Sequence, residues 1–195
     1  MRKILLLLSN GFEALEAAPF TDIFGWNKII GSKDITLISG GFHNSLNTTF
    51  NLKVLPEINL NFEEISLEDF EAIIIPGGFG RAGFFQDIKT DKFKSLIKNF
   101  YIKEKYIVGI CTGTFALGEA NILNNIPATT YLFENKRYFN QLISYGAIPI
   151  EKEIVIHNKI ITTSAPKTSI DIAFKLLELL TSTENMLKVK KEMGF

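Results

Sequence analysis

Residues 106–123 read YIVGICTGTFALGEANIL and contain the only cysteine of the chain, Cys111. Residues 106–110 are bulky and mostly β-branched or aromatic, whereas the residues after Cys111 are small or helix-forming. The stretch therefore predicts a strand that ends at Cys111 and a helix that follows it. Gly109 and Gly113 flank the cysteine in a G-x-C-x-G pattern. This pattern is the thiol counterpart of the G-x-S-x-G nucleophile elbow, in which small neighbours allow a sharp turn that presents a nucleophile.

The role of Cys111 has two interpretations. A thiol at the N-terminus of a helix meets unpaired N–H groups and the positive end of the helix dipole, which predicts a lowered pKa and a reactive thiolate. The alternative is a buried cysteine that packs as a small apolar side chain. The flanking glycines favour the reactive cysteine, because packing alone does not require them.

The composition predicts a single α/β domain over residues 1–195. A chain of 195 residues, 46% of them hydrophobic, can bury a sizeable core. Basic and acidic residues balance at 21 each, so we expect neither nucleic acid nor a membrane as a partner. One cysteine cannot form an internal disulfide, which fits a reducing cytoplasm. The apolar run Ile4–Leu8 is too short for a signal peptide or a membrane span and is expected to be a buried strand.

Apolar strands alternate with amphipathic helices along the chain. Continuous apolar strands suit a parallel sheet with helices on both faces, so we expect a doubly wound α/β fold whose reactive loops lie at the carboxyl ends of the strands. The expected strands are Lys3–Leu8, Ile35–Ser39, Ala72–Ile75 and Tyr106–Ile110, with a hairpin of Glu153–His157 and Lys159–Thr163. The expected helices are Leu15–Ile29, Asp91–Ile102 and one after Pro166.

Two further loops follow predicted strands and carry residues suited to chemistry. The loop after the first strand contains Glu13 and Glu16, and a later loop contains the pair Gly77 and Gly78, whose backbone N–H groups can turn toward an oxyanion. The alternatives are two solvated glutamates in a first helical turn and an ordinary Pro-Gly-Gly turn. Because the carboxyl ends of parallel strands share one edge of the sheet, we expect both loops to meet Cys111 there.

Five motifs occur in order: GFEALEAAPFTDIF (11–24), IPGGFG (75–80), GICTGTFALGEANIL (109–123), PATTY (127–131) and ITTSAPKTSIDIAFKLLELL (161–180). Together they resemble the motifs of the ThiJ/PfpI superfamily of class I glutamine amidotransferase-like domains. The resemblance covers nearly the whole chain. It implies a flavodoxin-like sandwich with a mostly parallel sheet, and a homodimer.

The resemblance also implies roles for individual residues. Cys111 matches the elbow nucleophile, and Glu16 matches a buried glutamic acid whose carboxyl contacts the sulfur, with Glu13 as the other candidate for that place. Gly78 and Thr112 match the residues whose backbone N–H groups form an oxyanion pocket. Gly77 and Tyr131 are further candidate pocket residues. A carboxyl in such an apolar pocket is expected to have a raised pKa and to act as a neutral hydrogen-bond donor.

The chain departs from the superfamily in its histidines. PfpI-type proteases place a histidine directly after the cysteine, where this chain has Thr112. Other members place one in the segment after the elbow, where this chain has Tyr131. The two histidines present are His43, in a glycine-rich loop, and His157, in a predicted hairpin turn, and both are expected at the surface.

Two classes of function follow from these residues. In the first, Cys111 acts as the nucleophile of a glyoxalase- or deglycase-like hydrolase or lyase that converts a small reactive carbonyl. In the second, Cys111 is a peroxide-reactive thiol of a stress sensor or chaperone-like protein and is oxidised to a sulfinate beside Glu16. A third possibility is that the protein has lost activity and serves as an interaction protein. An intracellular protease or amidase is less favoured, because no histidine follows the family pattern. No phosphate loop, nucleotide fingerprint or metal-ligand cluster occurs in the sequence, so we expect no cofactor and no metal.

Overall fold

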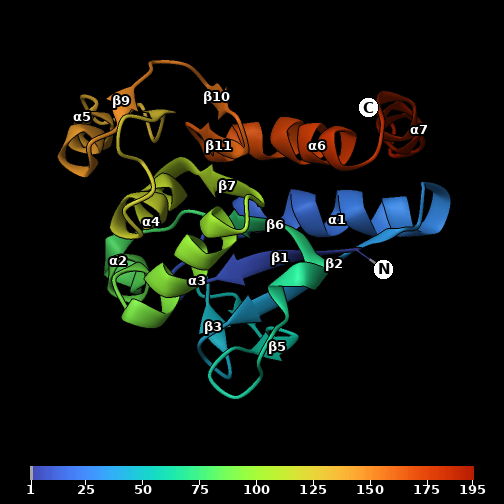
Figure 1. The fold of residues 1–195 in the computed structure, drawn as a ribbon, viewed down its shortest axis with the longest axis horizontal. Helices are drawn as coiled ribbons and strands as arrows, with labels where there is room; N and C mark the ends of the chain where they lie inside the picture. The colour runs from blue at the N-terminus through green and yellow to red at the C-terminus, as the bar shows by residue number, and fades with distance from the viewer. Residues whose placement is uncertain (1) are drawn as a thin grey trace.

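The computed structural model describes residues 2–195 and contains a seven-stranded sheet covered by helices (Figure 1). In spatial order the strands are β10 (Ile154–His157), β11 (Ile160–Thr163), β7 (Tyr106–Ile110), β6 (Phe70–Ile75), β1 (Arg2–Leu8), β2 (Ile35–Gly41) and β5 (Ile58–Asn59). β10 pairs antiparallel with β11, and all the other neighbours in this sheet are parallel. The sheet is the mostly parallel, doubly wound one that the sequence predicted.

The helices and the remaining strands complete the fold. The helices are α1 (Ala14–Ile30), α2 (Phe84–Ile88), α3 (Asp91–Ile102), α4 (Thr114–Glu119), α5 (Arg137–Gln141), α6 (Ser169–Leu180) and α7 (Thr183–Glu192). Two small ladders pair β3 (Leu46–Asn47) with β4 (Lys53–Val54) and β8 (Pro127–Ala128) with β9 (Ile148–Pro149). The strands and the helices over residues 15–29 and 91–102 that the sequence predicted are all present, with ends that differ by at most two residues.

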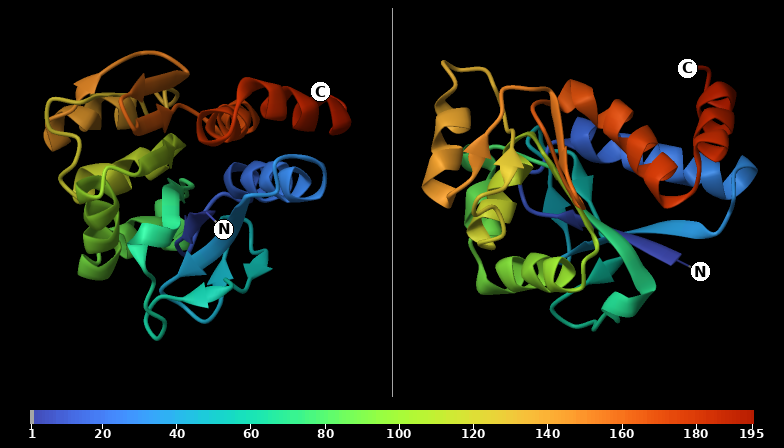
Figure 2. Two further views of the ribbon diagram at one scale, coloured as in Figure 1. Left: turned by 45° about the vertical axis from the view of Figure 1, so that its right-hand side comes forward. Right: turned by 45° about the horizontal axis from the view of Figure 1, so that its top comes forward.

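Alternate side chains of β1 are buried in two hydrophobic cores, one on each face of the sheet. Ile4, Leu6 and Leu8 belong to the core that α1 and α6 cover, whereas Leu5 and Leu7 belong to the core that α3 and α4 cover. This is the period of two expected of a strand buried on both sides. Figure 2 shows α1, α6 and α7 together on one side of the sheet and α3 with α4 on the other.

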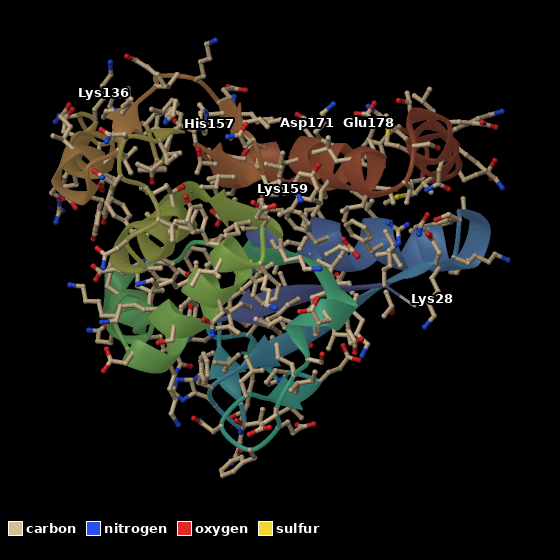
Figure 3. The ribbon with its side chains drawn as sticks, in the orientation of Figure 1. Lys28, Lys136, His157, Lys159, Asp171 and Glu178 are labelled. Carbon is tan, nitrogen blue, oxygen red and sulfur yellow. The ribbon has the colours of Figure 1, made fainter. Side chains whose placement is uncertain are left out.

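The exposed faces of α1 and α6 carry both charged and apolar side chains, with Trp26 and Ile29 of α1 and Leu179 of α6 among the apolar ones. Figure 3 labels Lys28 on α1 and Asp171 and Glu178 on α6 among the charged ones. Within residues 2–195, no helix combines the length and the apolar character that crossing a membrane requires.

The carboxyl ends of the central strands bring three loops together. β1 leads into the loop before α1, β6 into the Pro76-Gly77-Gly78 loop, and β7 directly into Cys111. Phe12 ties two of these loops, because it forms an antiparallel bridge with Gly78 and a parallel bridge with Thr48. The expected meeting of these loops at one edge of the sheet is therefore present.

Candidate active site

Cys111 occupies the sharp turn that the G-x-C-x-G pattern predicted. Its φ angle is +53°, a left-handed conformation that side-chain-bearing residues rarely adopt. The turn continues as a short 3₁₀ segment, Cys111–Gly113, into α4. Glycine is required at 113, because a Cβ atom there would lie 2.2 Å from the carbonyl oxygen of Ile75. The strand, the turn and the helix have the geometry of the elbow that the sequence predicted.

Glu16 lies in the first turn of α1 and is 1% exposed. Its carboxyl accepts a hydrogen bond from the Gly77 backbone N–H at 2.5 Å and lines the same cavity as the thiol of Cys111. Burial raises the pKa of Glu16 to about 8, although the Gly77 N–H and the Cys111 thiol act against the shift. Glu16 is therefore largely a neutral acid at neutral pH and a carboxylate above pH 8. Glu13, the other candidate, contacts the same cavity from a less buried position, where burial raises its pKa as well.

The environment of Cys111 reverses one expectation. The sequence predicted a lowered pKa, but burial, followed by the charge of Glu16, raises the pKa of the Cys111 thiol. The Thr112 backbone N–H, which points at the sulfur, opposes this shift without overcoming it. The reason lies in the depth of the elbow: Cys111 is only 7% exposed, and α4 is only six residues long. Desolvation of the thiolate outweighs a short helix dipole.

In the predicted oxyanion pocket, one of the two backbone N–H donors, that of Gly78, is already hydrogen-bonded within the protein. The Gly78 backbone N–H donates to the hydroxyl of Thr112 at 2.9 Å, and that hydroxyl donates to the Gly78 carbonyl at 2.9 Å. The N–H of Thr112 is directed at Cys111. The side chain that stands where PfpI-type proteases have a histidine thus fastens the loop after β6 to the elbow.

A cavity of about 300 Å³ opens above the sulfur. It brings together six of the residues selected from the sequence, namely Glu13, Glu16, Gly78, Cys111, Thr112 and Tyr131. Gly77, the seventh, reaches the site through its N–H bond to Glu16. The sequence did not single out five other lining residues, Leu15, Phe79, Glu134, Tyr138 and Pro166. Leu15, Phe79 and Pro166 lie inside the motifs quoted above, but nothing in those motifs marked them as pocket residues. Glu134 and Tyr138 lie outside the motifs, a few residues after Tyr131.

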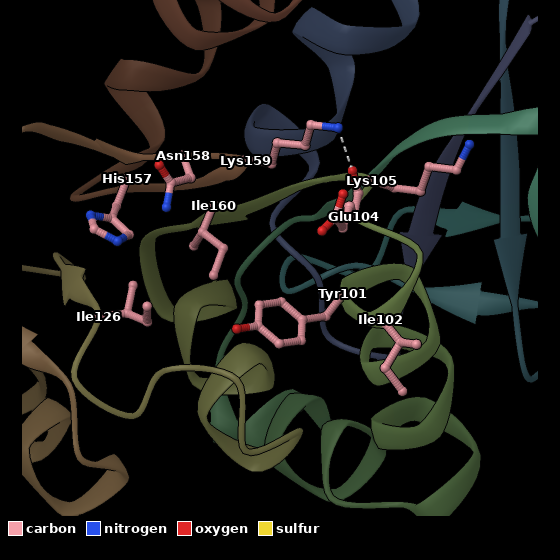
Figure 4. Close-up of a pocket in the computed structure, with 9 residues that line it drawn as sticks. All are labelled: Tyr101, Ile102, Glu104, Lys105, Ile126, His157, Asn158, Lys159 and Ile160. Carbon is pink, nitrogen blue, oxygen red and sulfur yellow. Dashed lines mark hydrogen bonds between the residues drawn. The ribbon is translucent and has the colours of Figure 1, made fainter.

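Neither histidine lines this cavity. His43 contacts Asp87, whose carboxylate lies 2.9 Å from Nε2. His157 lies at the hairpin of β10 and β11, beside the start of β7, whereas Cys111 follows the end of β7. There it lines a separate groove of about 520 Å³ (Figure 4), with Tyr101, Asn158 and Ile160. The part of the chain that the structure describes contains no group of three or more His, Cys, Asp and Glu side chains placed to hold a metal ion.

The fold and the elbow define an α/β protein with a buried cysteine and a carboxylic acid at the carboxyl edge of a parallel sheet. The chain belongs to the DJ-1/PfpI family, whose model matches residues 2–179. Its architecture is the flavodoxin-like one of that family. The solved structure of DJ-1 from Schizosaccharomyces pombe superposes with a TM-score of 0.81 at 24% identity, over 99% of both chains.

Relatives by sequence carry different names. Isonitrile hydratase from Pseudomonas putida is 28% identical over 134 residues, which are 69% of this chain and 55% of that protein. DJ-1 homolog B from Arabidopsis thaliana is 23% identical over 190 residues, 97% of this chain and 40% of that protein. The chain thus spans about half the length of these curated relatives.

Proposed function

We propose that this protein uses Cys111 as a nucleophile toward a small reactive carbonyl compound, in a glyoxalase-like reaction. The observation that carries the proposal is the placement of the Cys111 thiol and the buried carboxyl of Glu16 together in the wall of one cavity, where each shifts the pKa of the other. A thiol and an acid–base group in contact, at a site that a small molecule can enter, are the minimum for nucleophilic catalysis.

The proposed reaction converts an α-oxoaldehyde and water into an α-hydroxy acid. In the molecules in which Glu16 is ionised, sulfur attacks the aldehyde carbon and the thiol proton passes to the Glu16 carboxylate. The C=O electron pair moves to oxygen, which takes this proton from Glu16 to give a hemithioacetal. Glu16 then moves a proton from this carbon to the neighbouring carbonyl carbon through an enediol, which leaves a thioester. Water hydrolyses the thioester and regenerates the thiol. No external oxidant or reductant is needed.

Thr112 and Gly78 are the proposed donors to the developing oxyanion. The N–H of Thr112 already points at the sulfur. The N–H of Gly78 serves only when the Thr112 hydroxyl releases it, because the two are hydrogen-bonded.

The same observations favour this reaction over the other two candidates. A peroxide sensor reacts through a standing thiolate, which burial and the Glu16 charge disfavour. In the carbonyl reaction the Glu16 carboxylate can take the thiol proton as the sulfur attacks. Peptide hydrolysis needs an acid to protonate a poor amine leaving group, and neither histidine lines the cavity.

The test compares the wild type, Cys111→Ser and Glu16→Gln on methylglyoxal and on a fluorogenic peptide. We expect the wild type to form the hydroxy acid, both variants to lose at least 100-fold in rate, about what one acid–base group contributes, and the peptide to stay intact. An isonitrile is the second substrate, because a relative at 28% identity is an isonitrile hydratase. Peptide cleavage that disappears in Cys111→Ser would contradict the proposal, as would inactivity on both small molecules.

A further inference from the structure

The charged residues that line the Cys111 cavity are all acidic. Glu13, Glu16 and Glu134 line it, and no lysine, arginine or histidine of residues 2–195 does. Glu16 lies at the floor, where it is buried, whereas Glu134 is exposed at the rim. Any ligand on its way to the sulfur therefore passes a carboxylate at the entrance and approaches a second acid below.

An unusual turn holds Glu134 at the rim. Glu134, Asn135 and Lys136 have φ angles of +52°, +56° and +60°, so three consecutive side-chain-bearing residues adopt the left-handed conformation. Strained backbone of this kind clusters at sites that bind ligands. Lys136, the nearest lysine in sequence, pairs with Glu151 at 2.6 Å and does not face Glu134 as its ion-pair partner. The Glu134 charge reaches into the cavity, since after burial and the Cys111 charge it contributes to a raised pKa of Tyr131.

The rest of the wall is apolar or aromatic. Leu15, Phe79, Tyr131, Tyr138 and Pro166 form it, and the volume of about 300 Å³ is at the lower end of pockets that accept drug-sized ligands. This space is larger than a three-carbon oxoaldehyde needs. An apolar substituent on the electrophile would fill it and gain burial free energy.

Two arginines border the aromatic part of the wall. The guanidinium carbon of Arg81 lies 5.7 Å from the ring centre of Phe79, and that of Arg137 lies 5.3 Å from the ring centre of Tyr138. These rings already have cationic partners, and a cationic ligand would meet two further positive charges. Among the groups that line the cavity, Glu134 is an exposed carboxylate that repels anions. Arg81 and Arg137 lie outside the lining and already occupy the aromatic rings that a cationic ligand would otherwise contact.

We propose that this cavity selects uncharged electrophiles with an apolar or aromatic substituent, and that Glu134 is the residue that rejects anionic ones. The proposal rests on the proposed function in taking Cys111 as the reacting group. It goes further in naming the charge and the shape of the substrate.

Alkylation tests the charge selection without requiring turnover. Iodoacetamide and iodoacetate are similar in size and share a leaving group: the Cys111 thiolate displaces iodide, the S–C bond forms and the C–I bond breaks. Their second-order rate constants are measured at pH 8 and low salt and are divided by those for 2-mercaptoethanol. Cys111 is the only cysteine, so the modification is specific.

We expect the protein to discriminate against iodoacetate roughly tenfold more than the small thiol does, the size of one nearby unit charge at partial screening. Glu134→Gln should reduce this discrimination several-fold, and Glu134→Lys should abolish it. Salt at about 1 M should weaken it in the wild type. Glu184→Gln, which removes the same charge from exposed α7, should leave it unchanged.

The shape selection is measured with iodoacetanilide, which adds a phenyl ring to iodoacetamide. We expect it to react faster than iodoacetamide after the same correction, and Tyr138→Ala to remove that advantage. The proposal would be overturned if the wild type discriminated between iodoacetamide and iodoacetate no more than 2-mercaptoethanol does. It would also be overturned if the Glu134 variants kept the wild-type ratio of these two rate constants. Charge selection without methylglyoxal turnover would contradict only the proposed reaction, whereas turnover without charge selection would contradict only this inference.

Discussion

The side-chain oxygen of Thr112 lies 2.9 Å from both the nitrogen and the oxygen of Gly78. One hydroxyl thus satisfies two backbone groups of the loop after β6 and fastens that loop to the elbow. Because both bonds are buried, their loss leaves a donor and an acceptor without partners, which is more costly than the net value of a hydrogen bond.

Replacement of Thr112 by valine should therefore lower the free energy of unfolding by about 1–3 kcal/mol, the cost of leaving buried polar groups unpaired. Thr129→Val is the matched control, because the Thr129 hydroxyl is buried without a hydrogen-bond partner among the described residues. Its replacement should be neutral or stabilising. Urea denaturation of both variants measures the difference, and equal losses would show that the Thr112 bridge contributes nothing particular.

The elbow should reject a side chain at Gly113. An added Cβ would lie 2.2 Å from the Ile75 carbonyl oxygen, a backbone atom that cannot move without disturbing β6. We expect Gly113→Ala to destabilise the fold by about 3 kcal/mol, as overpacking does, and to abolish Cys111 reactivity. Gly25→Ala in α1 is the control, since a Cβ there meets nothing within 4 Å. It should stabilise by up to about 1 kcal/mol through helix propensity, and thermal denaturation of both variants provides the comparison.

The buried acid should make stability depend on pH. The pKa of Glu16 rises from 4.5 to about 8 on folding, so between these values the folded chain retains a proton that the unfolded chain releases. The stability that this proton contributes is complete below pH 4.5 and is lost as the pH rises through 8, a fall of about 5 kcal/mol. Glu16→Gln should remove most of this slope, because an amide does not titrate. Denaturant titrations at pH 5.5, 7 and 8.5 measure the free energy of unfolding of both proteins. The same dependence of this free energy on pH in the wild type and in Glu16→Gln would argue against a raised pKa of Glu16.

The framework of the site could be predicted because its signals are local. The period of the apolar residues predicted the strands, and Gly109 and Gly113 predicted the turn at Cys111. The loop after the first strand indicated Glu13 and Glu16 at the edge where the elbow lies, and the family resemblance selected Glu16 of the two. These features depend on neighbours in the chain, which the sequence displays directly.

The rest of the site depends on contacts between distant segments. The pKa of Cys111 was predicted in the wrong direction, because the depth of the elbow follows from how the loops of β1 and β6 close over it. Glu134 was missed, because its place at the rim results from a left-handed turn in a segment without glycine. The bridge from Thr112 to Gly78 joins residues 34 apart in the chain, and no local pattern announces it.

The pairing of Cys111 with Glu16 as the reactive centre is tested most directly by the pH dependence of Cys111 alkylation with iodoacetamide. In the wild type the rate should rise with an inflection near pH 8, where Glu16 becomes the carboxylate that accepts the thiol proton. In Glu16→Gln that inflection should disappear, and the rate should rise only at a higher pH, as expected for a thiol whose pKa burial raises. A wild-type rate that is already constant below pH 7, or a profile that Glu16→Gln leaves unchanged, would contradict the account.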